Sequence, residues 1–245
     1  MVALVLALDG PLQAWGISAR FIRRTTLKVP TKSGILGMLA AAEGRLREES
    51  VADLFHLRFG VRVDQVGSVL CDFQTEIDWA ERELKPVSQK NFNRSAKPLT
   101  HRYYLQDYKF LAVVEGPENV IEGLDEALRN PSFPLYLGRR SCPPGRRIAL
   151  GVTEDSLEQT LKHHDWIAAE WYKRRQPQKV HLAYSRDALP GEDADEMLRD
   201  NPISFDPRER KYGLRQLIHG WASLENSNGR QPSTDHDPLA LLGGV

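Results

Sequence analysis

The chain has 245 residues, of which 33 are Lys or Arg and 33 are Asp or Glu, so its formal net charge is +0. This balance argues against a globally basic nucleic-acid protein and against a highly charged disordered protein. Hydrophobic residues make up 41% of the chain, enough for a core in one large domain or two small ones. Any electrostatic attraction to a partner must therefore be local.

The cysteine content and the first residues indicate a protein of the reducing cytoplasm. Cys71 and Cys142 are the only cysteines and lack a CxxC spacing, which argues against a disulfide framework and a structural zinc site. The apolar run 2–8 is short for a signal peptide, lacks a basic flank and ends at Asp9-Gly10-Pro11, so we expect a buried strand. No stretch approaches the roughly 20 apolar residues of a membrane span.

The hydrophobic pattern predicts strands and helices over residues 1–150. A helix begins at Thr31, a favourable N-cap residue, because Ile35, Leu39, Ala42 and Leu46 fall on one face. Strand patterns cover 2–8, 59–63, 69–77, 103–114 and 133–137, and further helix patterns cover 51–57 and 120–128. We interpret the order as βαββαβ, which predicts an α+β, ferredoxin-like (RRM-like) fold of the kind used by RNA-recognition modules.

The signal weakens after residue 150. A helix is expected over 155–161, followed by mixed polar, aromatic and basic sequence, so residues 151–222 are predicted to form a smaller, less regular C-terminal region. Residues 223–245 are rich in Asn, Ser, Gly, Pro and Asp and are predicted to be a flexible tail, with 238–242 as a docking segment.

Three basic segments lie within the neutral total. The first joins the first strand to the first helix, the second spans 85–109 with Asp107 as its only acid, and the third spans 138–147 without an acid. Their cations are Arg20, Arg23, Arg24, Lys28 and Lys32; Lys85, Lys90, Arg94, Lys97, Arg102 and Lys109; and Arg139, Arg140, Arg146 and Arg147. If the segments converge on one side of the sheet, they form a cationic surface suited to a phosphate backbone.

Aromatic residues lie among these charges, and a polar insertion interrupts two strands. Bases of single-stranded RNA stack on such rings, and the candidates are Trp15, Phe21, Phe92, Tyr103, Tyr104 and Tyr136. The alternative is that the basic loops are only solvated and the rings belong to the core. We interpret the insertion, about 78–102, as a protruding hairpin that becomes ordered on RNA; a plain surface loop is the alternative.

The sequence offers little chemistry for catalysis. Residues 30–34 lack the glycines of a Walker motif, although a helix start beside Lys32 could still bind phosphate. There is no HExxH motif or paired-carboxylate signature, and the adjacent His163 and His164 point in different directions on a helix, so we expect no metal and no cofactor. Metal-independent RNA cleavage is the enzymatic alternative, using His101, Tyr103 or Tyr104, and Lys90 or Lys97.

Several blocks, in order along the chain, resemble a known family. They are residues 8–16, 20–21, 30–37, 57–64, 72–75, 102–107 and 133–144, including Gln13-Ala14-Trp15-Gly16 and Gly138-Arg139-Arg140-Ser141. The sequence is similar over about 1–144 to the Cas-five family of the RAMP superfamily, subunits of the type I-E CRISPR surveillance complex, Cascade. The similarity is looser beyond residue 144.

The resemblance implies a ferredoxin-like RAMP domain with a protruding thumb. Such a subunit takes part in antiviral defence: it grips the 5′ handle of the CRISPR RNA (crRNA) and caps the backbone filament, beside the large subunit that recognises the PAM. It would reach target DNA through the complex. A separate subunit cleaves the precursor in type I-E systems, so a non-catalytic role is expected. A sister branch of the family does cleave precursor RNA, which keeps a metal-independent endoribonuclease as the alternative.

The candidate RNA-binding residues combine the basic segments with the resembling blocks. They are Gln13, Trp15, Arg20, Arg23, Arg24, Lys32, Ser33, Gly34, Lys90, Asn91, Arg94, Arg102, Tyr103, Arg139 and Arg140. A third hypothesis is a protein-binding adaptor whose basic loops meet acidic partners.

Overall fold

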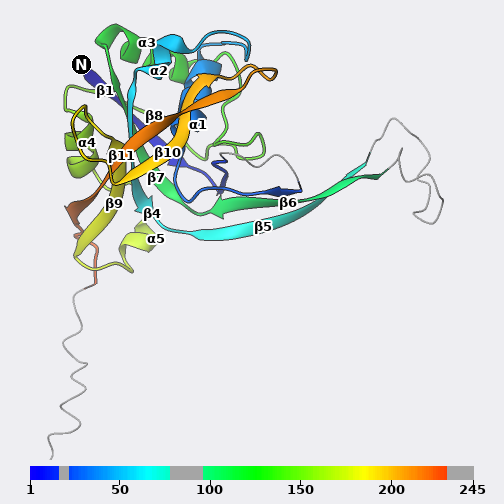
Figure 1. Ribbon diagram of the computed structural model, residues 1–245. Helices are drawn as coiled ribbons and strands as arrows, with labels where there is room; N and C mark the ends of the chain where they lie inside the picture. Colours follow the sequence, from blue (N-terminus) through cyan, green and yellow to red (C-terminus); the bar gives the residue numbers. More distant parts are fainter. Residues whose placement is uncertain (17–21, 78–95, 231–245) are drawn as a thin grey trace, which may run out of the picture.

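A computed structural model describes residues 1–16, 22–77 and 96–230 (Figure 1). They form an α+β structure with two antiparallel-rich sheets. The main sheet has the order β10-β11-β9-β4-β7-β1-β8, and the smaller one has the order β2-β6-β3 with β5 paired to β6. The main-sheet strands are β1 (Val2–Asp9), β4 (Arg58–Gln65), β7 (Lys109–Gly116), β8 (Ala149–Thr153), β9 (Lys179–Asp187), β10 (Glu196–Ser204) and β11 (Lys211–Glu225). The smaller sheet contains β2 (Leu12–Gln13), β3 (Arg23–Arg24), β5 (Ser68–Ile77) and β6 (Ala96–Gln106).

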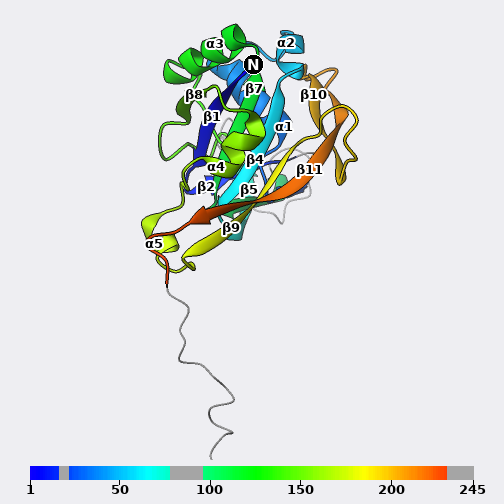
Figure 2. The same ribbon diagram turned by 90° about the vertical axis from the view of Figure 1, so that its left-hand side faces the viewer.

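Helices cover both faces of the main sheet (Figure 2). On one face, α1 (Lys32–Ala42) and α3 (Glu118–Arg129) pack on the larger hydrophobic cluster, which includes alternate residues of β1 and β7. On the other face, α4 (Leu157–His163) covers a second cluster with Trp166 and Leu182. The short helices are α2 (Ala52–Phe55) and α5 (Glu170–Lys173). None of the helices in the described ranges is long and apolar enough to cross a membrane.

The first predicted strand and helix are confirmed. β1 is buried on both faces and pairs with β7 and β8, as its continuous apolar run predicts. Thr31 caps α1, because its Oγ1 accepts a hydrogen bond from the Gly34 backbone N–H at 3.1 Å. The helix ends before Leu46, which is exposed rather than on the buried face.

The predicted strand 103–114 is in fact two strands in different sheets. Asp107 has φ of 60° and bends the chain between β6 and β7. An Asp tolerates this left-handed conformation better than most residues do. β6 therefore pairs with β5 in a long hairpin, here called the arm, which extends away from the main sheet (Figure 1). Of the predicted insertion, 96–102 belong to β6, and 78–95 lie outside the described residues.

Two further predictions need correction. Residues 133–137 form no strand: Leu137 instead exchanges backbone hydrogen bonds with Ala14 and Cys142, and β8 pairs with β1. Residues after 151 are more regular than expected, since β9, β10 and β11 extend the main sheet beyond β4. The predicted tail begins within β11, which runs to Glu225, and residues 231–245 lie outside the described residues.

Candidate nucleic-acid interface

Parts of all three basic segments meet where the arm leaves the main sheet. β3 lies parallel to β6, with Arg23 opposite His101 and Arg24 opposite Arg102. The exposed Arg23 donates from Nη2 to the Tyr103 hydroxyl at 3.0 Å, and this hydrogen bond raises the pKa of Arg23. The third segment reaches the same place through the loop after Leu137. We call the surface formed by Arg23, Arg24, Arg102, Tyr103, Arg139 and Arg140 the arm base.

Arg139 holds the arm base together. Its guanidinium donates to the backbone oxygens of Tyr103 at 3.0 Å and Arg24 at 2.7 Å, and it lies 4.9 Å from the centre of the Tyr104 ring. A planar, multi-donor side chain is needed to bridge two backbone segments in this way. Arg139 therefore positions β3 against β6, whereas the adjacent Arg140 is exposed to solvent.

The structure does not support direct RNA contact by the side chains of Gln13 and Trp15. Gln13 is fully buried, donates to the backbone oxygens of Leu8 at 3.0 Å and Tyr108 at 2.9 Å, and accepts from Trp15 Nε1 at 3.1 Å. Trp15 is only 1% exposed, so its ring faces are covered by protein. Both residues act inside the fold, where they join β2 to the core.

The resembling sequence blocks pack against one another through glycines. A Cβ at Gly34 would lie 2.9 Å from the Trp15 ring, and one at Gly138 would lie 1.8 Å from the Ala14 carbonyl oxygen. Gly138 also has φ of 86°, a conformation that favours glycine. The blocks around residues 13, 34 and 138 therefore pack together beneath the Arg139 loop of the arm base. Gly34 is a packing residue, because it leaves room for the Trp15 ring.

The start of α1 is not open to a phosphate, which corrects the expectation for Lys32. Lys32 is 4% exposed; its Nζ lies 3.0 Å from Asp187 Oδ2, and its backbone N–H donates to Asp200 Oδ2 at 2.8 Å. Arg215 completes the group by donating to both carboxylates at 2.7–2.8 Å. Protein carboxylates thus take the place predicted for phosphate, and the neighbouring Ser33 Oγ lies 3.4 Å from Thr31 Oγ1.

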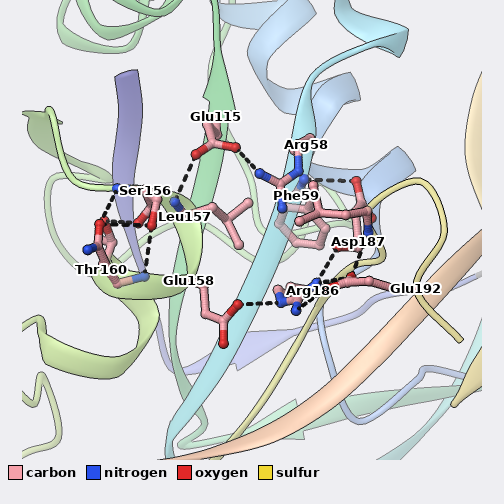
Figure 3. Close-up of polar contacts among 12 residues, drawn as sticks. Arg58, Phe59, Glu115, Ser156, Leu157, Glu158, Thr160, Arg186, Asp187 and Glu192 are labelled. Atoms are coloured by element: carbon pink, nitrogen blue, oxygen red, sulfur yellow. Dashed lines mark hydrogen bonds and ion pairs between the residues drawn. The ribbon is translucent and has the colours of Figure 1, made fainter. Parts of the chain in front are cut away.

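A second set of ion pairs joins β4 to β7 and β9 to α4 (Figure 3). Arg58 pairs with Glu115, which also accepts from the Leu157 backbone N–H at 3.0 Å and so caps α4. Arg186 pairs with Glu158 and Glu192, and its hydrogen bonds lower the pKa of Glu192 to about 2. Neighbouring cations lower the pKa of both Glu158, through Lys162 and Arg186, and Glu192, which suits a structural role better than proton transfer.

The remaining candidates are distributed as follows. Arg20, Lys90, Asn91 and Arg94, like Phe21, Phe92 and Lys85, lie outside the described residues. Among the residues that are described, no group of three or more His, Cys, Asp or Glu could hold a metal ion. Of the two cysteines, Cys71 is exposed on the arm, and burial raises the pKa of the Cys142 thiol.

Sequence reasoning missed the groups that close the start of α1 and one aromatic ring on the arm. Asp187, Asp200 and Arg215 are more than 150 residues from Lys32 along the chain, and no short spacing signals their contact. The exposed Phe73, whose ring lies 5.3 Å from that of His101 on the arm, was also not singled out. Its place in the apolar alternation of the strand 69–77 was the available signal.

Comparisons with known proteins agree on one family. Residues 3–218 match the family model described as "CRISPR-associated protein (Cas_Cas5)". The Escherichia coli (strain K12) protein "CRISPR system Cascade subunit CasD" is 30% identical over 217 residues, covering 84% of this chain and 91% of that protein. A solved chain described as "CRISPR RNA-guided surveillance complex" matches with a TM-score of 0.72, 27% identity and 98% coverage of both chains. Another, "Crystal structure of Cas protein", gives 0.67 and 33%, covering 94% of this chain and 98% of that one.

Proposed function

The chain belongs to the Cas-five family of CRISPR-associated proteins, and on this basis we propose that it is a non-catalytic RNA-binding subunit of a CRISPR surveillance complex. In this role it grips the 5′ handle of the crRNA and caps one end of the backbone filament. The observation that carries the proposal is the arm base, where β3, β6 and the 139–140 loop bring cations from three sequence segments to one surface.

The proposal includes a ferredoxin-like unit. The segment of the main sheet in the order β4-β7-β1-β8 is antiparallel throughout. Its chain order is strand, helix, strand, strand, helix, strand when β1, α1, β4, β7, α3 and β8 are taken in turn. This order and pairing support the proposed split βαββαβ unit, with the arm as an insertion between β4 and β7.

The chemistry of the arm base suits an RNA backbone that bends around the arm. Arg23 and Arg140 are exposed and supply phosphate contacts, while Arg139 fixes the backbone that carries them. Phe73 is exposed beside His101 on the same arm and offers a ring for an unstacked base. Phosphate contacts then supply affinity, and a small number of base contacts fix the register of the handle.

RNA titrations test this assignment. An Arg23→Ala/Arg140→Ala variant should bind labelled handle RNA more weakly and lower the salt slope by about 0.7 for each lost phosphate contact on a single strand. The matched control is Arg208→Ala/Arg210→Ala, which removes two exposed arginines from the turn before β11. An unchanged slope in the first variant would remove the arm base from the RNA site.

The proposal also assigns partners. The subunit contacts the backbone subunits and the large PAM-recognising subunit, meets target DNA through the assembled complex, and works in the cytoplasm. Assembly with those subunits should protect the handle from nuclease. Co-purification that survives nuclease treatment without protected RNA would instead favour the protein-binding adaptor.

The geometry favours binding over RNA cleavage. Tyr104 is buried, with its hydroxyl 3.2 Å from Ser141 Oγ, and the Tyr103 hydroxyl accepts a hydrogen bond from Arg23. His101 Nδ1 lies 4.0 Å from the Cys71 sulfur, and its ring packs on Phe73. Incubation with repeat RNA in EDTA checks the point: specific cleavage that disappears in His101→Ala would overturn the non-catalytic role.

A further inference from the structure

A second exposed cation cluster surrounds α5, outside the three basic segments. Trp171, Lys173, Arg174 and Arg175 follow one another along and after this short helix. Arg230 joins them, because its backbone N–H donates to the Gln176 oxygen at 2.9 Å and it bridges to Pro177. We call these five residues the α5 patch.

Positive charge exceeds negative charge in the α5 patch. Glu170 is the acid of this segment; it pairs with Lys173 at 3.1 Å and accepts from Asn228 at 2.9 Å. Within the described part of the chain, the guanidinium groups of Arg174, Arg175 and Arg230 have no carboxylate within ion-pair distance. Lys179 is left out of the patch because it lies opposite Glu225 in the β9–β11 pairing.

Trp171 holds Arg175 in an exposed position. The guanidinium carbon lies 5.2 Å from the centre of the Trp171 ring, and Trp171 itself is 48% exposed. The Tyr172 ring packs edge-on against the Trp171 ring at a centroid distance of 5.7 Å, which limits the movement of the indole. An arginine restrained by stacking loses less entropy on binding, while its N–H groups remain available to a planar or tetrahedral anion.

The α5 patch lies beside the arm but on the edge opposite the arm base. Ala169, just before α5, donates to Gln65 Oε1 at 3.0 Å, and Gln65 ends β4 close to the start of β5. β5 and β3 flank β6 on opposite sides, so α5 adjoins the β5 edge and the arm base adjoins the β3 edge (Figure 1). A nucleic acid bound at the arm base therefore does not have to contact the α5 patch.

We propose that the α5 patch is a second nucleic-acid site, which binds a phosphodiester backbone through Arg174 and Arg175. The ligand chemistry is shared by the guide RNA and by DNA brought to the complex. This inference depends on the proposed function in one respect, that the subunit lies next to nucleic acid in the complex. It involves residues different from those of the arm base.

The test uses the purified full chain and three fluorescent probes: single-stranded RNA, single-stranded DNA and duplex DNA. In Arg174→Ala/Arg175→Ala, the slope of log affinity against log salt should fall by about 1.4 on a single strand or about 1.8 on a duplex. Arg208→Ala/Arg210→Ala is the charge-matched control, placed at the turn between β10 and β11. Loss on the RNA probe assigns the patch to RNA, and loss on a DNA probe assigns it to DNA.

A second variant separates stacking from charge. Trp171→Ala keeps every cation but releases Arg175, so affinity should fall several-fold while the salt slope stays near that of the wild type. Trp171→Phe should restore most of the affinity, because a ring remains under the guanidinium.

The outcomes distinguish this inference from the proposed function. Loss of binding in Arg23→Ala/Arg140→Ala together with unchanged slopes in the α5 double variant would overturn the inference and leave the arm base in place. The reverse pattern would support the α5 patch and overturn the arm base. Absence of binding by the wild type to all three probes at low salt, or loss of an acidic protein partner with unchanged nucleic-acid slopes, would overturn the α5 site.

Discussion

Removal of the Asp200 carboxylate tests why α1 cannot bind phosphate. Asp200 is buried and accepts from Lys32 N at 2.8 Å, Arg215 Nε at 2.7 Å and Arg215 Nη2 at 2.8 Å. In the wild type, Lys32 and Arg215 balance Asp187 and Asp200. In Asp200→Ala the same cluster carries one uncompensated positive charge, and three donors lose their acceptor.

The expected loss of stability is about 3–5 kcal/mol, the usual effect of breaking a buried ion pair by removing one partner. With an m-value of about 3 kcal/mol per molar urea, the unfolding midpoint should fall by about 1–1.7 M. Asp200→Asn should lose less, because its amide oxygen still accepts from one or two of the three donors. The assay is equilibrium unfolding in urea, followed by circular dichroism and by tryptophan fluorescence.

The control is Glu209→Ala, which breaks an exposed pair with Lys211 and should change stability by less than about 1 kcal/mol. A loss below about 1 kcal/mol in Asp200→Ala would refute the assignment of Asp200 as the carboxylate that stabilises the helix start. Increased phosphate or RNA affinity in a folded Asp200→Ala protein would show instead that this carboxylate masks an anion site.

Three other predictions concern the supports of the arm base and the ion pairs. Gly138→Ala should lower the free energy of unfolding by at least about 2 kcal/mol, because Gly138 has a positive φ and a Cβ there would meet the Ala14 backbone. The control Gly123→Ala, on an open helix face, should raise it by about 1 kcal/mol. Equal unfolding midpoints for the two variants would contradict this prediction. Arg139→Lys should lose the double bridge and speed hydrogen exchange at the His101 amide, which donates to Ile22; unchanged exchange would exclude the bridging role. Arg186 lowers the pKa of Glu192 from 4.5 to about 2, so the ionised carboxylate stabilises the folded state above about pH 5 and this stabilisation declines as the pH falls toward 2. The difference in urea midpoint between the wild type and Glu192→Gln should therefore be largest above about pH 5. A difference that does not change with pH would contradict this prediction.

Local signals in the sequence predict local structure well in this chain. The Thr31 cap and the apolar spacing after it give α1, and the unbroken apolar run gives β1, because both depend on neighbours within a few residues. The division of the strand 103–114 was harder to predict: the polar pair Gln106-Asp107 within an apolar run was the available sign of a bend. Residues 133–137 alternate like a strand, but Pro134 and the turn at Gly138 allow no ladder.

The candidate site was harder to predict because the same residue types serve the core and a nucleic-acid surface. Trp15 and Tyr104 lie among basic residues in sequence, yet both are buried, and the charge around them says nothing of which way a ring points. Lys32 shows the same difficulty for a cation, since its partners come from strands more than 150 residues away. The conditional expectation that the basic segments converge holds for Arg23, Arg24 and Arg139, because β3, β6 and the hydrogen bonds of Arg139 bring them together.

The neutral net charge has a structural explanation that bears on binding. Three buried pairs, Arg62 with Asp64, Lys32 with Asp187, and Arg215 with Asp200, neutralise their cations inside the fold rather than on the surface. A field outside the protein arises from the charges that remain unpaired. Exposed arginines lie on two sides of the arm: Arg23 and Arg140 at the arm base, and Arg174 and Arg175 in the α5 patch beside the arm. Under the proposed function, a chain with no net charge attracts a polyanion through these local charges, and we expect the attraction to weaken steeply with salt.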